Sequence, residues 1–97
     1  MARPPKLDDA QIEREIATTP GWELRDGKLC REFKFSDFVQ AFGFMTRLAL
    51  VAERLNHHPE WENVYNTVRI AMSTHDVQGL SALDFEFARA ANESLAG

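Results

Sequence analysis

The sequence has one cysteine, no long apolar run and no cluster of basic residues. Cys30 has no partner in the chain for a disulfide, so this 97-residue fold must depend on its core or on oligomerisation. No stretch approaches the roughly 20 apolar residues of a membrane-spanning helix, and residues 1–6 lack the apolar stretch of a signal peptide. We therefore expect a cytoplasmic protein with no membrane partner.

Positive charge is also scarce. The chain has 11 Lys and Arg residues against 15 Asp and Glu residues, a formal net charge of -4, and no basic run interleaved with aromatic residues. This balance disfavours direct binding of nucleic acid or of an anionic membrane surface. The sequence also has no Gly-rich phosphate loop and no nucleophile elbow. Cys30 has no histidine near it in sequence, so we expect it to be packing rather than a nucleophile.

The chain as a whole fits one domain over residues 1–97, because hydrophobic residues make up 44% of the 97 residues.

The first half of the chain predicts a helix and a hairpin. A capping-box pattern at Asp8 predicts a helix that runs to about Thr18. Asp26-Gly27 accommodates the positive φ angles of a two-residue turn, so residues 22–35 are predicted to form a hairpin around it.

A long helix is predicted over about residues 37–55, with Ser36 as its N-cap. The residues expected to face the sheet recur at spacings of three and four: Phe38, Phe42, Met45, Ala49 and Ala52. Other apolar residues extend beyond that stripe: Phe44, Leu48, Leu50 and Val51. A helix that is apolar on more than one side usually buries more than one side, which predicts a subunit interface. The alternative is a thick core under a small sheet.

The second half of the chain predicts two more strands, over residues 61–65 and 67–74, and a last helix. Ser81 and Asp84 form a capping-box pattern that opens this helix, which runs to about Leu95. The element order is α-β-β-α-β-β-α. Two hairpins in this order favour an α+β fold, with a four-stranded antiparallel sheet and three helices on one face.

All three histidines of the chain lie between residues 57 and 75. Histidine has an unperturbed pKa of about 6.5 and exchanges protons near neutral pH. His57 and His58 follow the long helix, and His75 returns to them if the two intervening strands form a hairpin. This predicts three imidazoles around one pocket, although a single histidine is more often a structural or surface residue.

Other interpretations of this region remain open. Three histidines can hold catalytic zinc, but this spacing matches no HExxH or CxxC arrangement, and adjacent residues are awkward ligands for one metal. Glu53 and Asp84 could orient imidazoles through hydrogen bonds. Glu53 also fits a solvated helix residue, and Asp84 fits a capping residue. Three aromatic side chains could stack on a flat heterocycle or pack in the core: Trp22, Trp61 and Tyr65.

Together these residues resemble the signature of the pterin-4a-carbinolamine dehydratases, which is matched here by Glu53, His57, His58, Pro59, Tyr65, His75 and Asp84. The resemblance runs from about Leu7 to Ala91. It implies the α+β fold above and a homodimer or homotetramer assembled through helices. It also implies dehydration of 4a-hydroxytetrahydrobiopterin, or a related 4a-hydroxytetrahydropterin, to the quinonoid dihydropterin. This reaction recycles the cofactor of aromatic amino-acid hydroxylases and needs no metal or organic cofactor.

The same resemblance assigns roles to the site residues. It makes the three histidines catalytic, with His57 and His75 as the acid/base pair and His58 chiefly holding the pterin. The pterin-contacting segments are implied to be Asn56-His57-His58 and Ser73-Thr74-His75-Asp76, and Glu53 and Asp84 would support them. Asn56 stands where many relatives carry an acidic residue. Animal relatives also serve as dimerisation cofactors for a homeodomain transcription factor, which makes a binding module the alternative function.

Overall fold

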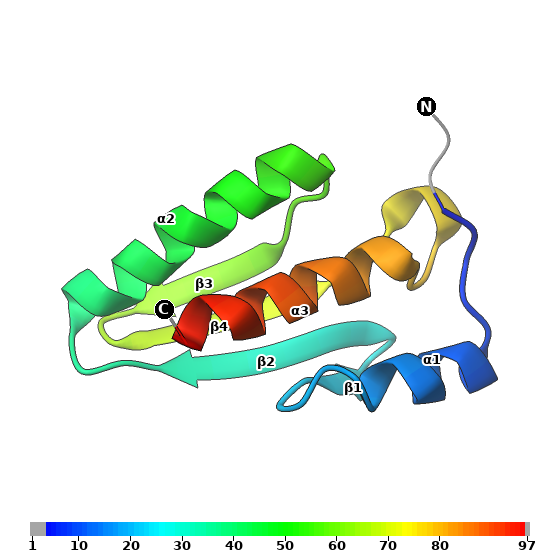
Figure 1. The fold of residues 1–97 in the computed structure, drawn as a ribbon, viewed down its shortest axis with the longest axis horizontal. Helices are drawn as coiled ribbons and strands as arrows, with labels where there is room; N and C mark the ends of the chain where they lie inside the picture. Colours follow the sequence, from blue (N-terminus) through cyan, green and yellow to red (C-terminus); the bar gives the residue numbers. More distant parts are fainter. Residues whose placement is uncertain (1–3, 97) are drawn as a thin grey trace.

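Four antiparallel strands form one sheet, and three helices cover one of its faces (Figure 1). The computed structural model describes residues 4–96. This architecture confirms the predicted α+β fold and its element order. In chain order the elements are α1 (Asp9–Ile16), β1 (Glu23–Arg25), β2 (Lys28–Lys34), α2 (Phe38–Leu55), β3 (Glu60–Val64), β4 (Thr67–Met72), the 3-10 helix η1 (His75–Val77) and α3 (Ala82–Ala96).

Both hairpins have two-residue turns. In the first, Asp26 and Gly27 have φ angles of 52° and 77°, and Leu24 pairs with Leu29, as the Asp-Gly pattern predicts. In the second, Val64 pairs with Thr67 around a turn whose first residue also has a positive φ angle. The turns therefore set the register of β1 with β2 and of β3 with β4.

The sheet order is β1-β2-β4-β3, so β4 lies between β2 and β3. Both neighbours are antiparallel to β4, so β2 and β3 run in the same direction, and α2 crosses over between them. Glu60 at the start of β3 pairs with Ala71 near the end of β4. The residues that leave α2 and those that leave β4 therefore meet at one end of the molecule (Figure 1).

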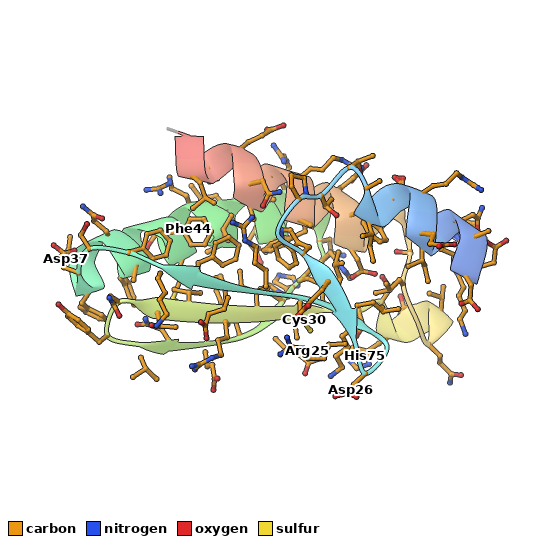
Figure 2. The ribbon with its side chains drawn as sticks, turned by 90° about the horizontal axis from the view of Figure 1, so that it is seen from below. Arg25, Asp26, Cys30, Asp37, Phe44 and His75 are labelled. Carbon is orange, nitrogen blue, oxygen red and sulfur yellow. The ribbon has the colours of Figure 1, made fainter. Side chains whose placement is uncertain are left out.

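The core lies between the sheet and the helices. Phe44 from α2 packs there, with its ring centroid 4.8 Å from that of Phe33 and 5.0 Å from that of Phe35. Figure 2 shows Phe44 above the sheet on the side of the helices. Alternate residues of β4 face this core, and all of them are buried: Val68, Ile70 and Met72.

The predicted sheet-facing stripe of α2 is wrong at Phe38, Phe42 and Ala49, although Ala52 is buried and Met45 packs against the core. The residues of α2 that are buried in the core are Ala41, Phe44, Leu48 and Ala52. Phe38 and Phe42 are about half exposed, and Ala49 is exposed. The helix has two apolar stripes, and hydrophobic periodicity does not distinguish them. The second stripe stays at the surface of the chain, so the predicted excess of apolar surface on α2 is present.

The helix caps follow the predicted chemistry with one shift. Asp8 forms the predicted capping box of α1 with Gln11, through two hydrogen bonds of 2.8 Å, although α1 ends at Ile16, before Thr18. The N-cap of α2 is Asp37 rather than Ser36, because the Asp37 carboxylate accepts the backbone N–H of Gln40 at 2.9 Å. Neighbouring Ser and Asp residues are equally good caps, so sequence alone does not choose between them.

The segment before α1 is tied to the end of the molecule that carries η1. The backbone N–H of Leu7 donates to the carbonyl of Leu80 at 2.8 Å. The side chain of Lys6 lies so close to Gly79 that an added Cβ would be 2.7 Å from the Lys6 Cε. Between residues 4 and 96, no helix has the length and apolar character needed to cross a membrane.

Candidate active site

The abrupt termination of α2 positions the first two histidines. Asn56 caps the helix in the left-handed conformation, with φ 49° and ψ 46°, and the backbone N–H of His57 donates to the carbonyl of Ala52 at 3.0 Å. Pro59 follows and restricts the backbone before β3 begins at Glu60. Only a few residues therefore separate helix from strand, and they carry both imidazoles.

A tight loop after β4 positions the third histidine. Thr74 and Gly79 form an isolated bridge, in which the N–H of Thr74 donates to the carbonyl of Gly79 at 2.7 Å. Between them, His75 begins the 3-10 helix η1, whose C-cap Gln78 has a φ angle of 53°. The bridge closes the loop at its base, so the segment that begins at His75 projects from the end of the sheet.

These two segments line one cavity of about 250 Å³. Its lining residues are His57, His58, Ser73, Thr74, His75 and Asp76. The prediction that the three histidines come together is therefore matched by the geometry. Asn56, the remaining predicted contact residue, is exposed at the helix cap and is not among the lining residues. Figure 2 shows His75 at the end of the molecule opposite Asp37, where α2 begins.

His57 is held from behind by a buried carboxylate. Its Nε2 lies 2.6 Å from Oδ1 of Asp84, and the two side chains are 5% and 0% exposed. Asp84 belongs to the first turn of α3, and its Oδ2 accepts the backbone N–H of Ser81 at 2.9 Å. The capping and imidazole-orienting interpretations of Asp84 are thus both realised by the same carboxylate. A carboxylate in this position fixes the orientation of an imidazole ring.

His58 has a carboxylate partner of a different kind. Its Nε2 lies 2.6 Å from Oε1 of Glu53, but these side chains are 56% and 77% exposed. Glu53 lies in the last turn of α2, so it reaches His58, two residues after the helix cap. The pair is open to solvent, and water screens its attraction.

Other features that could carry chemistry lie away from this cavity. Cys30 lies on the open face of the sheet, where burial raises the pKa of its thiol, so little thiolate forms near neutral pH. Figure 2 shows it pointing away from the helices. A larger hollow of about 440 Å³ lies over the same strands, but it is lined by no histidine. Within residues 4–96, no group of three His, Cys, Asp or Glu side chains is arranged to hold a metal ion.

None of the aromatic residues considered for stacking lines the histidine cavity. Trp22 is buried in the core, Trp61 borders the larger hollow and Tyr65 lies in the exposed β3–β4 turn. For Ser81, in contrast, the capping-box pattern predicts only a helix cap. Its hydroxyl is buried and lies 2.7 Å from that of Thr74. The capping-box pattern at residues 81–84 predicts the cap but gives no signal for this contact.

Comparison with known proteins assigns this arrangement to a class. The family model described as pterin 4 alpha carbinolamine dehydratase matches residues 5–94. A Prochlorococcus marinus (strain MIT 9303) protein provisionally named pterin-4-alpha-carbinolamine dehydratase is 60% identical over 86 residues, which cover 89% of this chain and 90% of that protein. A Rhizobium etli protein with the same provisional name is 48% identical over 93 residues, covering 94% of this chain and 92% of that one.

A solved structure agrees with the sequence comparisons. It is the crystal structure of a transcriptional coactivator/pterin dehydratase from Brucella melitensis, which is 42% identical, with a TM-score of 0.89 over 92% of this chain and 97% of that one. The chain belongs to the pterin-4a-carbinolamine dehydratase family. It is an enzyme of the hydro-lyase class, and its activity is the dehydration of a pterin-4a-carbinolamine.

Proposed function

We propose that this enzyme dehydrates 4a-hydroxytetrahydrobiopterin, or a related 4a-hydroxytetrahydropterin, by histidine acid/base catalysis, and so recycles the cofactor of aromatic amino-acid hydroxylases. The observation that carries the proposal is that His57, His58 and His75 line one cavity. The reaction adds a proton to the departing 4a-hydroxyl and removes a proton from N5. Two imidazoles on different segments are suited to those two tasks.

The proposed reaction balances with two proton transfers. One imidazolium of the pair His57 and His75 protonates the departing 4a-hydroxyl, so that the C4a–O bond breaks and water leaves. The other, neutral imidazole takes the proton from N5, and the N–H electron pair forms the C4a=N5 bond of the quinonoid dihydropterin. Solvent then restores both protonation states. A positioned acid or base typically contributes about 10² to 10⁴ in rate.

The remaining lining residues are proposed to hold the pterin. His58, steadied by Glu53, contacts the ring, and Ser73, Thr74 and Asp76 supply the polar surface beside it. Asn56 is proposed to contact the substrate from the rim of the site, since it directly precedes His57. This mechanism uses no metal or organic cofactor, because the protons are moved by side chains alone.

The acid/base proposal is tested by replacing each histidine. Rapid-mixing ultraviolet spectroscopy follows the decay of synthetic 4a-hydroxytetrahydropterin. We expect His57→Ala and His75→Ala to lower kcat by about 10² to 10⁴-fold, and His58→Ala mainly to raise KM. Lys34→Ala is the control, because Lys34 is exposed at the far end of β2. A folded wild-type enzyme that left the spontaneous rate unchanged would refute this substrate.

We also propose that the enzyme is one cytoplasmic domain that assembles as a homodimer or homotetramer. The exposed apolar stripe of α2 supports this: Phe38, Val39, Phe42 and Leu50, of which Val39 is 76% and Leu50 71% exposed. Exposed apolar residues on one helix face are typical of a protein–protein contact. Light scattering during size-exclusion chromatography measures the assembled mass. A monomer at micromolar concentration would contradict the proposal.

A coactivator role is the second candidate function. The Brucella melitensis protein is titled a transcriptional coactivator as well as a pterin dehydratase, and the apolar stripe of α2 is a surface on which a transcription factor could pack here. Such a role does not depend on the histidines. A pull-down that captures a transcription factor equally well with wild type and with a triple histidine-to-alanine variant would support it.

A further inference from the structure

Two buried hydroxyls stand behind Asp84, on the side away from His57. Thr74 Oγ1 donates to Asp84 Oδ2 at 2.8 Å, and it also lies 2.7 Å from Ser81 Oγ. The backbone N–H of Leu83 donates to Ser81 Oγ at 3.3 Å. Thr74, Ser81 and Asp84 are each no more than 1% exposed. Solvent therefore does not compete for these hydrogen bonds, and each is stronger than it would be at the surface.

The direction of this chain of hydrogen bonds follows from counting protons. An ionised carboxylate only accepts, and each hydroxyl has a single proton to donate. Thr74 gives its proton to Asp84, so the contact between the hydroxyls is made by the proton of Ser81. Ser81 in turn accepts from Leu83. The order is therefore Leu83 N–H, Ser81 O–H, Thr74 O–H and then the carboxylate of Asp84.

The same count fixes the tautomer of His57. Asp84 Oδ2 accepts from the Thr74 hydroxyl and from the Ser81 backbone N–H, while Oδ1 faces Nε2 of His57 at 2.6 Å. Because Asp84 only accepts, the proton of that contact is on Nε2. Nδ1 of His57 is then the ring nitrogen left to exchange a proton in the cavity. A partner of one imidazole nitrogen sets the role of the other in this way.

We infer that Thr74 and Ser81 are positioning residues for the dehydration, which act through Asp84 on His57. This inference rests on the proposed role of His57 as an acid or base. It also refines the part of Thr74, because its N–H donates to Gly79 and its hydroxyl to Asp84. Both of its donors are used inside the protein, so Thr74 serves the reaction by holding Asp84 rather than by donating to the pterin.

The test combines a spectroscopic readout with kinetics. ¹⁵N NMR of histidine-labelled enzyme distinguishes the two imidazole tautomers, and His57→Gln assigns the signal. We expect His57 in wild type to carry its proton on Nε2. Thr74→Val should add the Nδ1–H tautomer and lower kcat about 10-fold, with KM within about twofold. Thr74→Ser should restore both readouts, and Ser81→Ala should act in the same direction as Thr74→Val but more weakly.

A matched control is available in β4, the strand that precedes Thr74. Thr67 is a buried threonine at the start of β4, and its hydroxyl donates to the side-chain oxygen of Asn66. Thr67→Val removes a buried hydroxyl just as Thr74→Val does, but it should leave the tautomer and kcat unchanged. If Thr74→Val does not fold, Ser81→Ala and the wild-type spectrum decide the question.

The outcomes separate this inference from the proposed function. A wild-type His57 with its proton on Nδ1 would overturn the inference, as would a folded Thr74→Val enzyme with unchanged spectrum and kcat. A rise in KM alone would also overturn it, because it would indicate direct contact with the pterin. If the tautomer depends on Thr74 but wild type shows no dehydration, the positioning is supported and the proposed function fails.

Discussion

The two histidine–carboxylate pairs of the site have the same length and very different surroundings. Both Nε2 to oxygen distances are 2.6 Å, but the pair of His57 and Asp84 is buried, whereas that of His58 and Glu53 is exposed. The Asp84 carboxylate has two further donors, and the structure fixes its position from several sides. The comparison teaches that distance alone does not measure what a pair does. The buried pair can set a tautomer, while the exposed pair can at most steady a ring.

The largest effect is expected from Asp84→Asn, which breaks the buried pair while keeping its volume. An amide in place of the carboxylate donates to Nε2 of His57 and so favours the wrong tautomer. A comparable change in a catalytic triad costs about 10⁴ in kcat, and we expect a loss of about 100-fold or more here. The free energy of unfolding should fall by about 1–3 kcal/mol, because buried donors lose their acceptor. Steady-state kinetics and chemical denaturation measure both.

Asp37→Asn is the control for this change. Asp37 caps α2 at the opposite end of the molecule, and Asn is an equally good N-cap, so activity and stability should stay at wild-type values. If Asp84→Asn retained wild-type kcat, the buried pair would have no part in catalysis. The two pairs would then differ only in burial and not in their effect on the reaction.

A smaller effect is expected from Glu53→Gln, which removes the charge of the exposed pair. Exposed ion pairs contribute about 0–1 kcal/mol, so the free energy of unfolding should change by less than about 1 kcal/mol. We expect kcat within about threefold of wild type and a modest rise in KM, because His58 is less well steadied. Glu13→Gln in α1 is the control, as an exposed helical glutamate outside the cavity. A loss in kcat as large as that of Asp84→Asn would erase the distinction.

The smallest effect is expected from salt. At 1 M ionic strength the screening length is about 3 Å, so an exposed pair is weakened and a buried one is nearly unaffected. Raising NaCl from 50 mM to 1 M should raise the KM of wild type by less than about threefold and leave kcat unchanged. Glu53→Gln should lose most of this sensitivity. A salt-dependent kcat that persists in Glu53→Gln would show that salt acts elsewhere.

Local sequence signals predicted most of the fold, because turns and helix caps are determined by a few neighbouring residues. Asp26-Gly27 supplies the positive φ angles of its turn, and Asp8 caps its helix whatever the rest of the chain does. The face of α2 was not predictable in this way. One of its two apolar stripes packs in the core and the other is exposed. Which stripe is buried depends on how the helix packs against the sheet and against α3. Periodicity gives the presence of a stripe but not its partner.

The same distinction between local signals and tertiary packing applies to the residues of the site. The loop histidines and the turn at the end of β4 were predictable, because a hairpin between them brings its two ends together. Ser81 was not predictable as part of the site. Its cap pattern explains its bond to the helix, but its contact with Thr74 arises only when the segment after β4 packs against the start of α3. A capping residue and a site residue look alike until the tertiary contacts are known.

The link between Leu7 and Leu80 has a practical consequence for handling the enzyme. This hydrogen bond and the Lys6–Gly79 contact place residues 6 and 7 beside the loop that carries His75. The last helix ends away from that loop (Figure 1). A purification tag, a fluorophore or a surface anchor is therefore better attached after α3, where its bulk lies far from the cavity mouth.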